Sequence, residues 1–148
     1  MPGGRKRPSW DVYAITLAQA AKTRSEDPYV QVGAVVFRSD NSVAGVGYNG
    51  PPSGVDVDWT DRDARRPRMI HAEANALRYA RPGEVDLLAV TMMPCVDCLK
   101  MAASYGVRTV VFAEGYENSA VYDDRETRGV AKDFGIQLVL VHIESETP

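Results

Sequence analysis

The sequence has few cysteines, few histidines and no long apolar run. It contains two cysteines and two histidines among 148 residues. A secreted chain held by disulfides usually has more cysteines spread along its length, so a disulfide framework is excluded. The longest apolar runs, such as residues 107–113, are far shorter than the roughly 20 residues that cross a bilayer. The basic N-terminus is not followed by an apolar stretch and is not a secretory signal. We therefore expect a cytoplasmic protein with no membrane partner.

An excess of positive charge is also missing. The formal net charge is −3 and the sequence pI is near 5.4. This balance makes nucleic acid an unexpected partner, although a small anionic substrate needs only one or two local cations. Hydrophobic residues make up 45% and charged residues 25%, which is typical of a globular chain. With no repeat or break in composition, we expect one domain over residues 1–148, with flexible ends at 1–8 and 144–148.

Hydrophobic periodicity predicts four helices and five strands. The strands at 32–37 and 43–48 are separated by a short polar turn, so they should form an antiparallel hairpin. The last three strands alternate with helices and should therefore be parallel. This order predicts a three-layer α/β/α sandwich around a five-stranded mixed sheet. The expected helices are at 10–22, 69–80, 95–105 and 120–134, and the remaining strands at 85–92, 107–113 and 136–143.

Two features lie at the borders of these elements. Ser9 directly precedes the first helix and is a candidate N-cap. Residues 49–68 form a long polar loop, and loops of this length in compact domains are usually functional or disordered. Within it, Trp59 would either stack on a base or anchor the loop.

The two cysteines stand together as Cys95-Val-Asp-Cys98, directly after Pro94. In a reducing compartment such a pair indicates either half of a metal site or a redox dithiol. A catalytic zinc ion takes three protein ligands and leaves one position for water. His71 is the candidate third ligand because it opens a helix, as the cysteines do, whereas His142 lies in the last strand. Helix N-termini stabilise thiolates and so favour metal binding.

Glu73 lies two residues after His71 and need not bind the metal. A carboxylate at this position can carry protons to a ring nitrogen and a leaving amine. Separately, the pieces would be a structural histidine, a redox dithiol and a surface glutamate. Together they form the pattern H-x-E…P-C-x-x-C, the signature of zinc-dependent nucleobase deaminases. We therefore predict a catalytic zinc ion bound by His71, Cys95 and Cys98, with Glu73 as the catalytic residue.

Beyond these motifs, the sequence resembles the cytidine and deoxycytidylate deaminase family, and it is most similar to the deoxycytidylate branch. Residues 31–37 (QVGAVVF) resemble the first strand of the family, and residues 47–54 (GYNGPPSG) resemble the segment after its second strand. Residues 71–75 (HAEAN) have the form typical of that branch. The similarity runs from about residue 10 to residue 143. It implies a sheet of the cytidine deaminase type, one Zn²⁺ per chain, a small nucleotide or nucleoside substrate, and a homo-oligomer, either dimer or hexamer.

The resemblance also implies which residues contact the substrate. Asn49 should contact the sugar or base, and the backbone N–H of Ala72 should hold the pyrimidine carbonyl. Glu73 would act as both acid and base. The other expected substrate contacts are Val32, Pro94, Tyr116 and Arg24.

The segment at 25–30 departs from the family pattern. Asp27 and Tyr29 stand where relatives often have Cys and Arg, and the lack of further cysteines excludes a second cysteine-bearing zinc site. The acidic pair Glu26 and Asp27 would repel a 5′-phosphate unless it points away. Arg24 or the loop arginines could bind the phosphate, since guanidinium groups suit bidentate phosphate binding. The alternative is that these loop arginines are solvated and neutralised by aspartates. They are Arg62, Arg65, Arg66 and Arg68.

Three functions follow from these observations. The leading hypothesis is hydrolytic deamination of dCMP to dUMP and ammonia. A second keeps the chemistry but changes the substrate to another nucleoside, a free base, a modified cytosine nucleotide or tRNA adenosine, although the acidic charge weighs against RNA. A third is a non-catalytic, zinc-stabilised binding module, which would have no use for Glu73.

Overall fold

The computed structural model of the chain describes residues 3–115 and 123–143. The elements in these ranges are, in chain order, α1 (Trp10–Lys22), β1 (Gly33–Arg38), β2 (Val43–Tyr48), α2 (Arg62–Arg65), the 3₁₀ turn η1 (Arg66–Arg68), α3 (Ala72–Leu77), β3 (Val85–Met92), α4 (Val96–Ser104), β4 (Thr109–Glu114), α5 (Arg125–Asp133) and β5 (Gln137–Leu140). None of these helices is long and apolar enough to cross a membrane.

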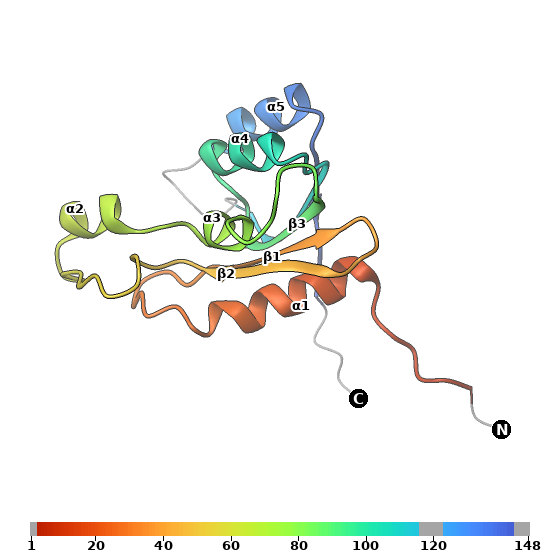
Figure 1. Cartoon of the computed structure of the whole chain (residues 1–148), viewed down its shortest axis with the longest axis horizontal. Helices are drawn as coiled ribbons and strands as arrows, with labels where there is room; N and C mark the ends of the chain where they lie inside the picture. Colours follow the sequence, from red (N-terminus) through yellow and green to blue (C-terminus); the bar gives the residue numbers. More distant parts are fainter. Residues whose placement is uncertain (1–2, 116–122, 144–148) are drawn as a thin grey trace.

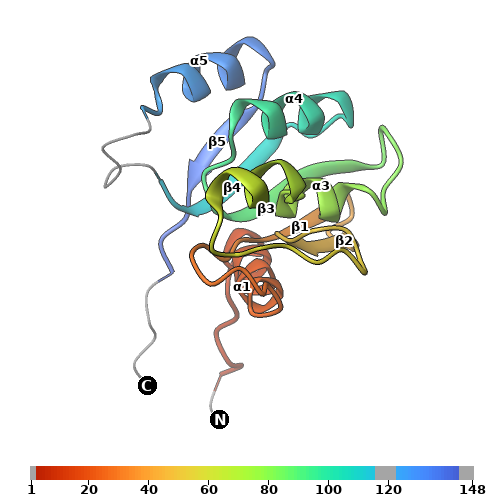
Figure 2. The same ribbon diagram turned by 90° about the vertical axis from the view of Figure 1, so that its left-hand side faces the viewer.

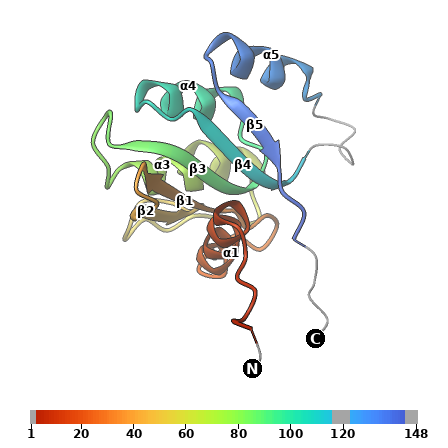
Figure 3. The ribbon, with the colours of Figure 1, turned by 90° about the vertical axis from the view of Figure 1, so that its right-hand side faces the viewer.

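Figure 1 shows β2 and β1 in front of the sheet, and Figure 3 shows all five strands, which form one mixed sheet in the order β2-β1-β3-β4-β5 with β2 at an edge. β1 pairs antiparallel with both β2 and β3. β3, β4 and β5 are parallel to one another. The predicted antiparallel hairpin and the predicted parallel end of the sheet are both confirmed.

Helices cover both faces of the sheet. Figure 2 shows α3, α4 and α5 on one face and α1 on the other, and Figure 3 shows α1 and α5 on opposite sides from the reverse direction. Because successive strand residues point to opposite faces, Ala34 and Val36 pack in the core under α3, α4 and α5. Val35 and Phe37 pack in the second core, against α1. The predicted three-layer sandwich is confirmed.

Several element boundaries match the prediction. Helix α1 begins and ends at the predicted residues, and the Ser9 hydroxyl accepts a hydrogen bond from the Val12 N–H at 3.2 Å. The strands predicted at 43–48 and 85–92 are also confirmed. The first strand begins and ends one residue later than predicted. Helix α4 is one residue shorter at each end, because Cys95 and Tyr105 are its caps.

Other predicted boundaries are wrong. The helix predicted at 69–80 spans only Ala72–Leu77, because Ile70 is extended and forms a β-bridge with Gly50. The loop predicted over 49–68 contains α2 and η1, which are too short to produce a periodic pattern. The last two strands are shorter than predicted, and α5 starts at Arg125. The start of the helix predicted at 120–134 and the end at 144–148 lie outside the described residues.

Two glycines of β2 allow α3 to lie directly against the sheet. A Cβ atom at Gly47 would lie 2.6 Å from the carbonyl oxygen of Ala72 and closer still to the backbone nitrogen of Ala76. A Cβ at Gly45 would overlap the Ala76 carbonyl. Only glycine permits so close an approach of two backbones. The position of α3, and of the residues at its start, therefore depends on these glycines.

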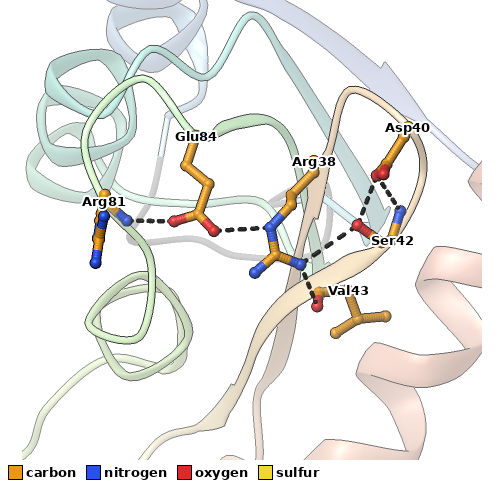
Figure 4. A network of polar contacts seen from close by, with 6 residues as sticks. All are labelled: Arg38, Asp40, Ser42, Val43, Arg81 and Glu84. Atoms are coloured by element: carbon orange, nitrogen blue, oxygen red, sulfur yellow. Dashed lines mark hydrogen bonds and ion pairs between the residues drawn. The ribbon is translucent and has the colours of Figure 1, made fainter.

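A polar network ties the β1–β2 hairpin to the connection between α3 and β3 (Figure 4). The Arg38 Nε donates to Glu84 Oε1 at 2.7 Å, and the Arg81 N–H donates to Glu84 Oε2 at 2.7 Å. Arg38 Nη1 also donates to the Val43 carbonyl at 3.0 Å. Glu84 directly precedes β3, whereas Cys95 follows the far end of that strand. The network therefore stabilises the fold away from the predicted metal ligands.

Candidate metal centre and active site

The three predicted metal ligands lie at the starts of two neighbouring helices. His71 is the N-cap residue of α3, and Cys95 is the N-cap residue of α4, with Cys98 in the first turn of α4. Neither His71 nor Cys95 makes a capping hydrogen bond with its side chain. These side chains instead face one another across the gap between the helices.

The ligand atoms of the three residues converge on one point. The Nδ1 atom of His71 lies 3.3 Å from the Sγ of Cys98 and 3.6 Å from the Sγ of Cys95. All three atoms lie within 4.8 Å of one another, and the described ranges hold no other such group of metal-ligating side chains. Two sulfurs and one imidazole nitrogen are a donor set typical of zinc, and three protein ligands leave a fourth position for a reacting molecule. The residues present therefore fit a catalytic zinc ion.

The pKa shifts of the three ligand residues are those of a group that can bind a metal ion. A hydrogen bond from the Cys98 thiol, together with the neighbouring His71, lowers the pKa of Cys95 to about 4. The same hydrogen bond, with burial, raises the pKa of Cys98. The hydrogen bond with Cys95 raises the pKa of His71, and the charge of Glu73 adds to this effect. The Cys98 thiol thus keeps its proton in the metal-free group, and metal binding would release it.

Glu73 lies in the first turn of α3 and is 4% exposed. Burial raises the pKa of its carboxyl, while a hydrogen bond from the Cys98 thiol and the charge of His71 oppose that shift. A buried carboxyl group with a raised pKa, placed beside a reaction centre, is typical of an acid–base catalyst. Glu73 therefore has the environment expected of an acid–base catalyst beside the metal ligands.

Asn49 joins the start of β1 to the end of β2. Its Oδ1 accepts from the Val32 N–H at 2.8 Å, and its Nδ2 donates to the Val30 carbonyl at 2.9 Å. The Asn49 side chain is almost fully buried. Its amide thus has a structural role, and one N–H of Nδ2 and one lone pair of Oδ1 remain beyond these two bonds.

Arg24 faces a cavity of about 480 Å³ between the edge strand β2, the loop after it and α3. The lining includes Glu26, Asn49 and Tyr48, and the Arg24 guanidinium carbon lies 5.9 Å from the centre of the Tyr48 ring. None of the three metal-ligand candidates lines this cavity. Arg24 and Asn49 therefore line one cavity beside α3.

The other predicted substrate contacts are neighbours of residues already described: Ala72 follows His71, Pro94 precedes Cys95, and Val32 is bonded to Asn49. Val32 is half-buried and bonded to Asn49, and Ala72 and Pro94 are buried. Ala72 opens α3, and the first N–H groups of a helix have no acceptor within it. Tyr116 lies outside the described residues.

In the acidic segment before β1, Glu26 and Asp27 do not both present their charge to the surroundings. Asp27 Oδ1 accepts hydrogen bonds from the N–H groups of Tyr29 at 2.8 Å and Val30 at 3.2 Å. Asp27 is 8% exposed, so its carboxylate is directed into its own turn. Of the acidic pair, only Glu26 is exposed.

The long loop is tied to the body of the protein at two places. At its base, Gly50 and Ile70 exchange backbone hydrogen bonds of 3.1 and 2.8 Å. Further out, the guanidinium carbon of Arg65 lies 4.2 Å from the centre of the Tyr29 ring. Asp61 caps α2 by accepting from two backbone N–H groups at 3.1 Å. The pairing of Arg65 with Tyr29 was not predicted, because no local sequence pattern connects residues so far apart.

A buried glutamate beside a His-Cys-Cys group at adjacent helix starts, on an α/β/α sandwich, defines the zinc-dependent deaminase class. The model of the cytidine and deoxycytidylate deaminase zinc-binding region matches residues 8–114. The chain belongs to the cytidine and deoxycytidylate deaminase family and is a zinc-dependent hydrolase that acts on a carbon–nitrogen bond. The predicted zinc cofactor is thereby confirmed.

Individual relatives support membership of the same family. The chain is 33% identical to human deoxycytidylate deaminase over 121 residues, which cover 74% of this chain and 68% of the human protein. It is 37% identical to the deoxycytidylate deaminase of Mycobacterium phage D29 over 123 residues, 72% of this chain and 95% of that protein. The crystal structure of the dCMP deaminase from cyanophage S-TIM5, in complex with dCMP and dUMP, superimposes with a TM-score of 0.75 at 26% identity and covers 93% of this chain and all of that one.

Proposed function

We propose that this chain hydrolyses dCMP to dUMP and ammonia. The convergence of His71 Nδ1 on the sulfurs of Cys95 and Cys98, beside the buried Glu73, carries this proposal. The names of the human and phage relatives support dCMP as the substrate, and so does the similarity to a structure that binds dCMP and dUMP.

In this proposal, each residue at the two helix starts has one task. His71, Cys95 and Cys98 hold the zinc ion, which when bound is a Lewis acid that lowers the pKa of a water molecule. The Glu73 carboxylate would accept one proton from the water that adds to C4 and pass it to N3 of the cytosine ring. It would then accept the proton of the new C4 hydroxyl group and pass it to the amine, as the C4–N bond breaks and ammonia leaves. The Ala72 N–H at the start of α3 holds the pyrimidine carbonyl, because this donor has no acceptor within the helix.

The substrate contacts are part of the proposal as well. The remaining N–H of the Asn49 Nδ2 would contact the sugar, with the bonds to Val30 and Val32 holding the amide in a fixed orientation. Burial of the amide makes this orientation costly to change. Val32, Pro94, Arg24 and Tyr116 remain the other proposed contacts.

We also propose that the chain acts as one deaminase domain, in the cytoplasm, as a homo-oligomer. A phage relative that the alignment covers to 95% of its length supports the single domain. The free thiols of Cys95 and Cys98 are suited to a reducing compartment, where thiolates stay available to a metal. Analytical ultracentrifugation of the zinc-loaded protein would test the oligomer.

The substrate is tested by measuring ammonia release from cytosine, cytidine, deoxycytidine, CMP, dCMP, dCTP and adenine compounds. We expect about one zinc ion per chain and the highest kcat/KM with dCMP. A chelated sample of the same preparation serves as the control and should be inactive until zinc is restored. Full activity without metal, or no turnover of any cytosine compound by the zinc-loaded protein, would contradict the proposal.

A further inference from the structure

We propose that Arg65, oriented by the ring of Tyr29, binds the 5′-phosphate of the substrate and thereby selects nucleotides over nucleosides. This inference rests on the proposed function, since it assigns the phosphate contact of the same reaction. It starts from one observation, the guanidinium carbon of Arg65 lying 4.2 Å from the centre of the Tyr29 ring. The two residues come from different segments, α2 and the connection between α1 and β1.

The positive charge of Arg65 is available for an anion. Among residues 3–115 and 123–143, no carboxylate oxygen lies within 4.0 Å of its guanidinium nitrogens. One Nη1 hydrogen bond runs to the Trp59 carbonyl, at 3.4 Å. Stacking on Tyr29 uses the face of the guanidinium group and leaves its edge, where the N–H donors point. An edge with several free N–H groups suits the bidentate binding of a phosphate.

The nearby acids do not neutralise this charge. Asp27 lies two residues before Tyr29, but its Oδ1 accepts the N–H groups of Tyr29 and Val30. Asp61, one turn before Arg65, caps the start of α2. Both carboxylates are thus directed toward backbone donors. The local sequence therefore pairs the aspartates with the backbone rather than with the arginine.

Both partners are anchored beside residues of the proposed site. The loop that carries Arg65 starts after Asn49 and ends before His71, and the Gly50–Ile70 bridge closes its base. On the other side, Val30 follows Tyr29 and binds the amide of Asn49 through its carbonyl. Figure 1 shows α2 beyond the end of the sheet where the α1–β1 connection also lies. The stacked pair thus links the two segments that border Asn49.

The other arginines of this region are placed less favourably. Arg24 faces a cavity that it shares with Glu26, a carboxylate that a phosphate would approach as well. The Nη1 of Arg68 donates to the Ala64 carbonyl at 2.6 Å, which directs this side chain back along η1 and α2. Arg66 is exposed, and nothing in the described part of the chain fixes its guanidinium group.

The test compares kcat/KM for dCMP and for deoxycytidine in the zinc-loaded protein and four variants. We expect Arg65→Leu to lower the ratio of the two values by about 10- to 100-fold, the range for charge-assisted hydrogen bonds, mainly by raising KM for dCMP. Tyr29→Leu should lower the ratio by a smaller factor, and Tyr29→Phe, which keeps the aromatic face, should preserve it. Arg66→Leu is the matched control and should behave as the unmodified protein.

Each outcome separates this inference from the function it rests on. A protein that prefers dCMP and whose Arg65→Leu variant keeps the full preference would overturn the role of Arg65 alone. An equal loss with dCMP and deoxycytidine would also overturn it, because that result indicates a structural role. Failure of the unmodified, zinc-loaded protein to act on dCMP would refute the proposed function itself. Zinc content and melting temperature of every variant show whether the fold is retained.

Discussion

Replacing Glu73 with glutamine should remove activity while making the metal-free protein more stable at neutral pH. The amide has nearly the same shape but cannot carry a proton. Loss of one acid–base catalyst typically lowers kcat by about 10²–10⁴-fold, or roughly 2.7–5.5 kcal/mol in the barrier. Because Glu73 is only 4% exposed, bulk water cannot readily replace it. We expect a loss in the upper half of that range, with the zinc content unchanged.

The stability change follows from the direction of the pKa shift. Burial raises the pKa of Glu73 in the folded protein above its ordinary value of 4.5. The folded state therefore favours the protonated carboxyl, and this contribution to stability is present below about pH 4.5 and is lost as the pH rises through the folded pKa. A glutamine has no such loss. The stability advantage of Glu73→Gln should thus be small at pH 4 and larger at pH 7.

Glu84 provides a control of opposite sign. The N–H of Arg81 and the guanidinium group of Arg38 lower the pKa of the Glu84 carboxyl. Its contribution is present above the unfolded pKa and is lost as the pH falls through the folded value. Glu84→Gln should therefore destabilise the protein at pH 7 but not at low pH, and should leave kcat unchanged.

Both variants are tested by urea unfolding of the chelated protein at pH 4 and pH 7, together with kcat and zinc analysis of the loaded enzyme. A Glu73→Gln enzyme with kcat within tenfold of the original would refute proton transfer by this residue. A stability advantage that shrinks as the pH rises would refute the argument from burial.

Three further predictions concern packing, the metal and capping. Gly47→Ala should cost about 1–3 kcal/mol of stability and lower zinc occupancy, because the added methyl group pushes α3 away from β2; unchanged urea unfolding and zinc content would contradict this. Removing the metal with a chelator should lower the melting temperature. It should also allow alkylation of Cys95 at pH 6, because its pKa is about 4, but not of the buried Cys98. Mass spectrometry shows which thiol is modified, and modification of Cys98 instead of Cys95 would contradict the prediction. Ser9→Ala should cost about 1 kcal/mol by removing the cap of α1; equal unfolding midpoints would show that the cap contributes nothing.

Elements defined by neighbouring residues could be predicted from the sequence. Helix α1 was found with its bounds, because a serine cap precedes an alanine-rich amphipathic run. The start of α3 could not be found in this way. Residues 69–71 continue the apolar spacing of the helix, but Ile70 gains its hydrogen bonds from Gly50, which lies far away in the sequence. These hydrogen bonds between residues distant in sequence set the start of α3, and the local sequence pattern does not indicate them.

The same distinction applies to the site. His71, Cys95 and Cys98 were predicted as one group because each motif opens a helix, and helix starts are local features. The arrangement around Tyr29 was not predicted, because it depends on how the long loop returns to the body of the protein. The sequence also could not show that the Asp27 carboxylate accepts a hydrogen bond from the Tyr29 N–H, which directs it into its own turn and not toward a phosphate.

The residues proposed for the reaction and for substrate selection lie on parts of the fold that are packed differently. His71 and Glu73 belong to a helix that lies against β2 with backbone contact at Gly47, so a displacement of either residue would require the core to move. Arg65 belongs to a loop whose contacts with the rest of the chain include the Gly50–Ile70 bridge and the Tyr29 ring. A change in that loop therefore costs little folding energy. Substitutions there, such as Arg65→Leu, should therefore alter the choice of substrate before they alter metal binding.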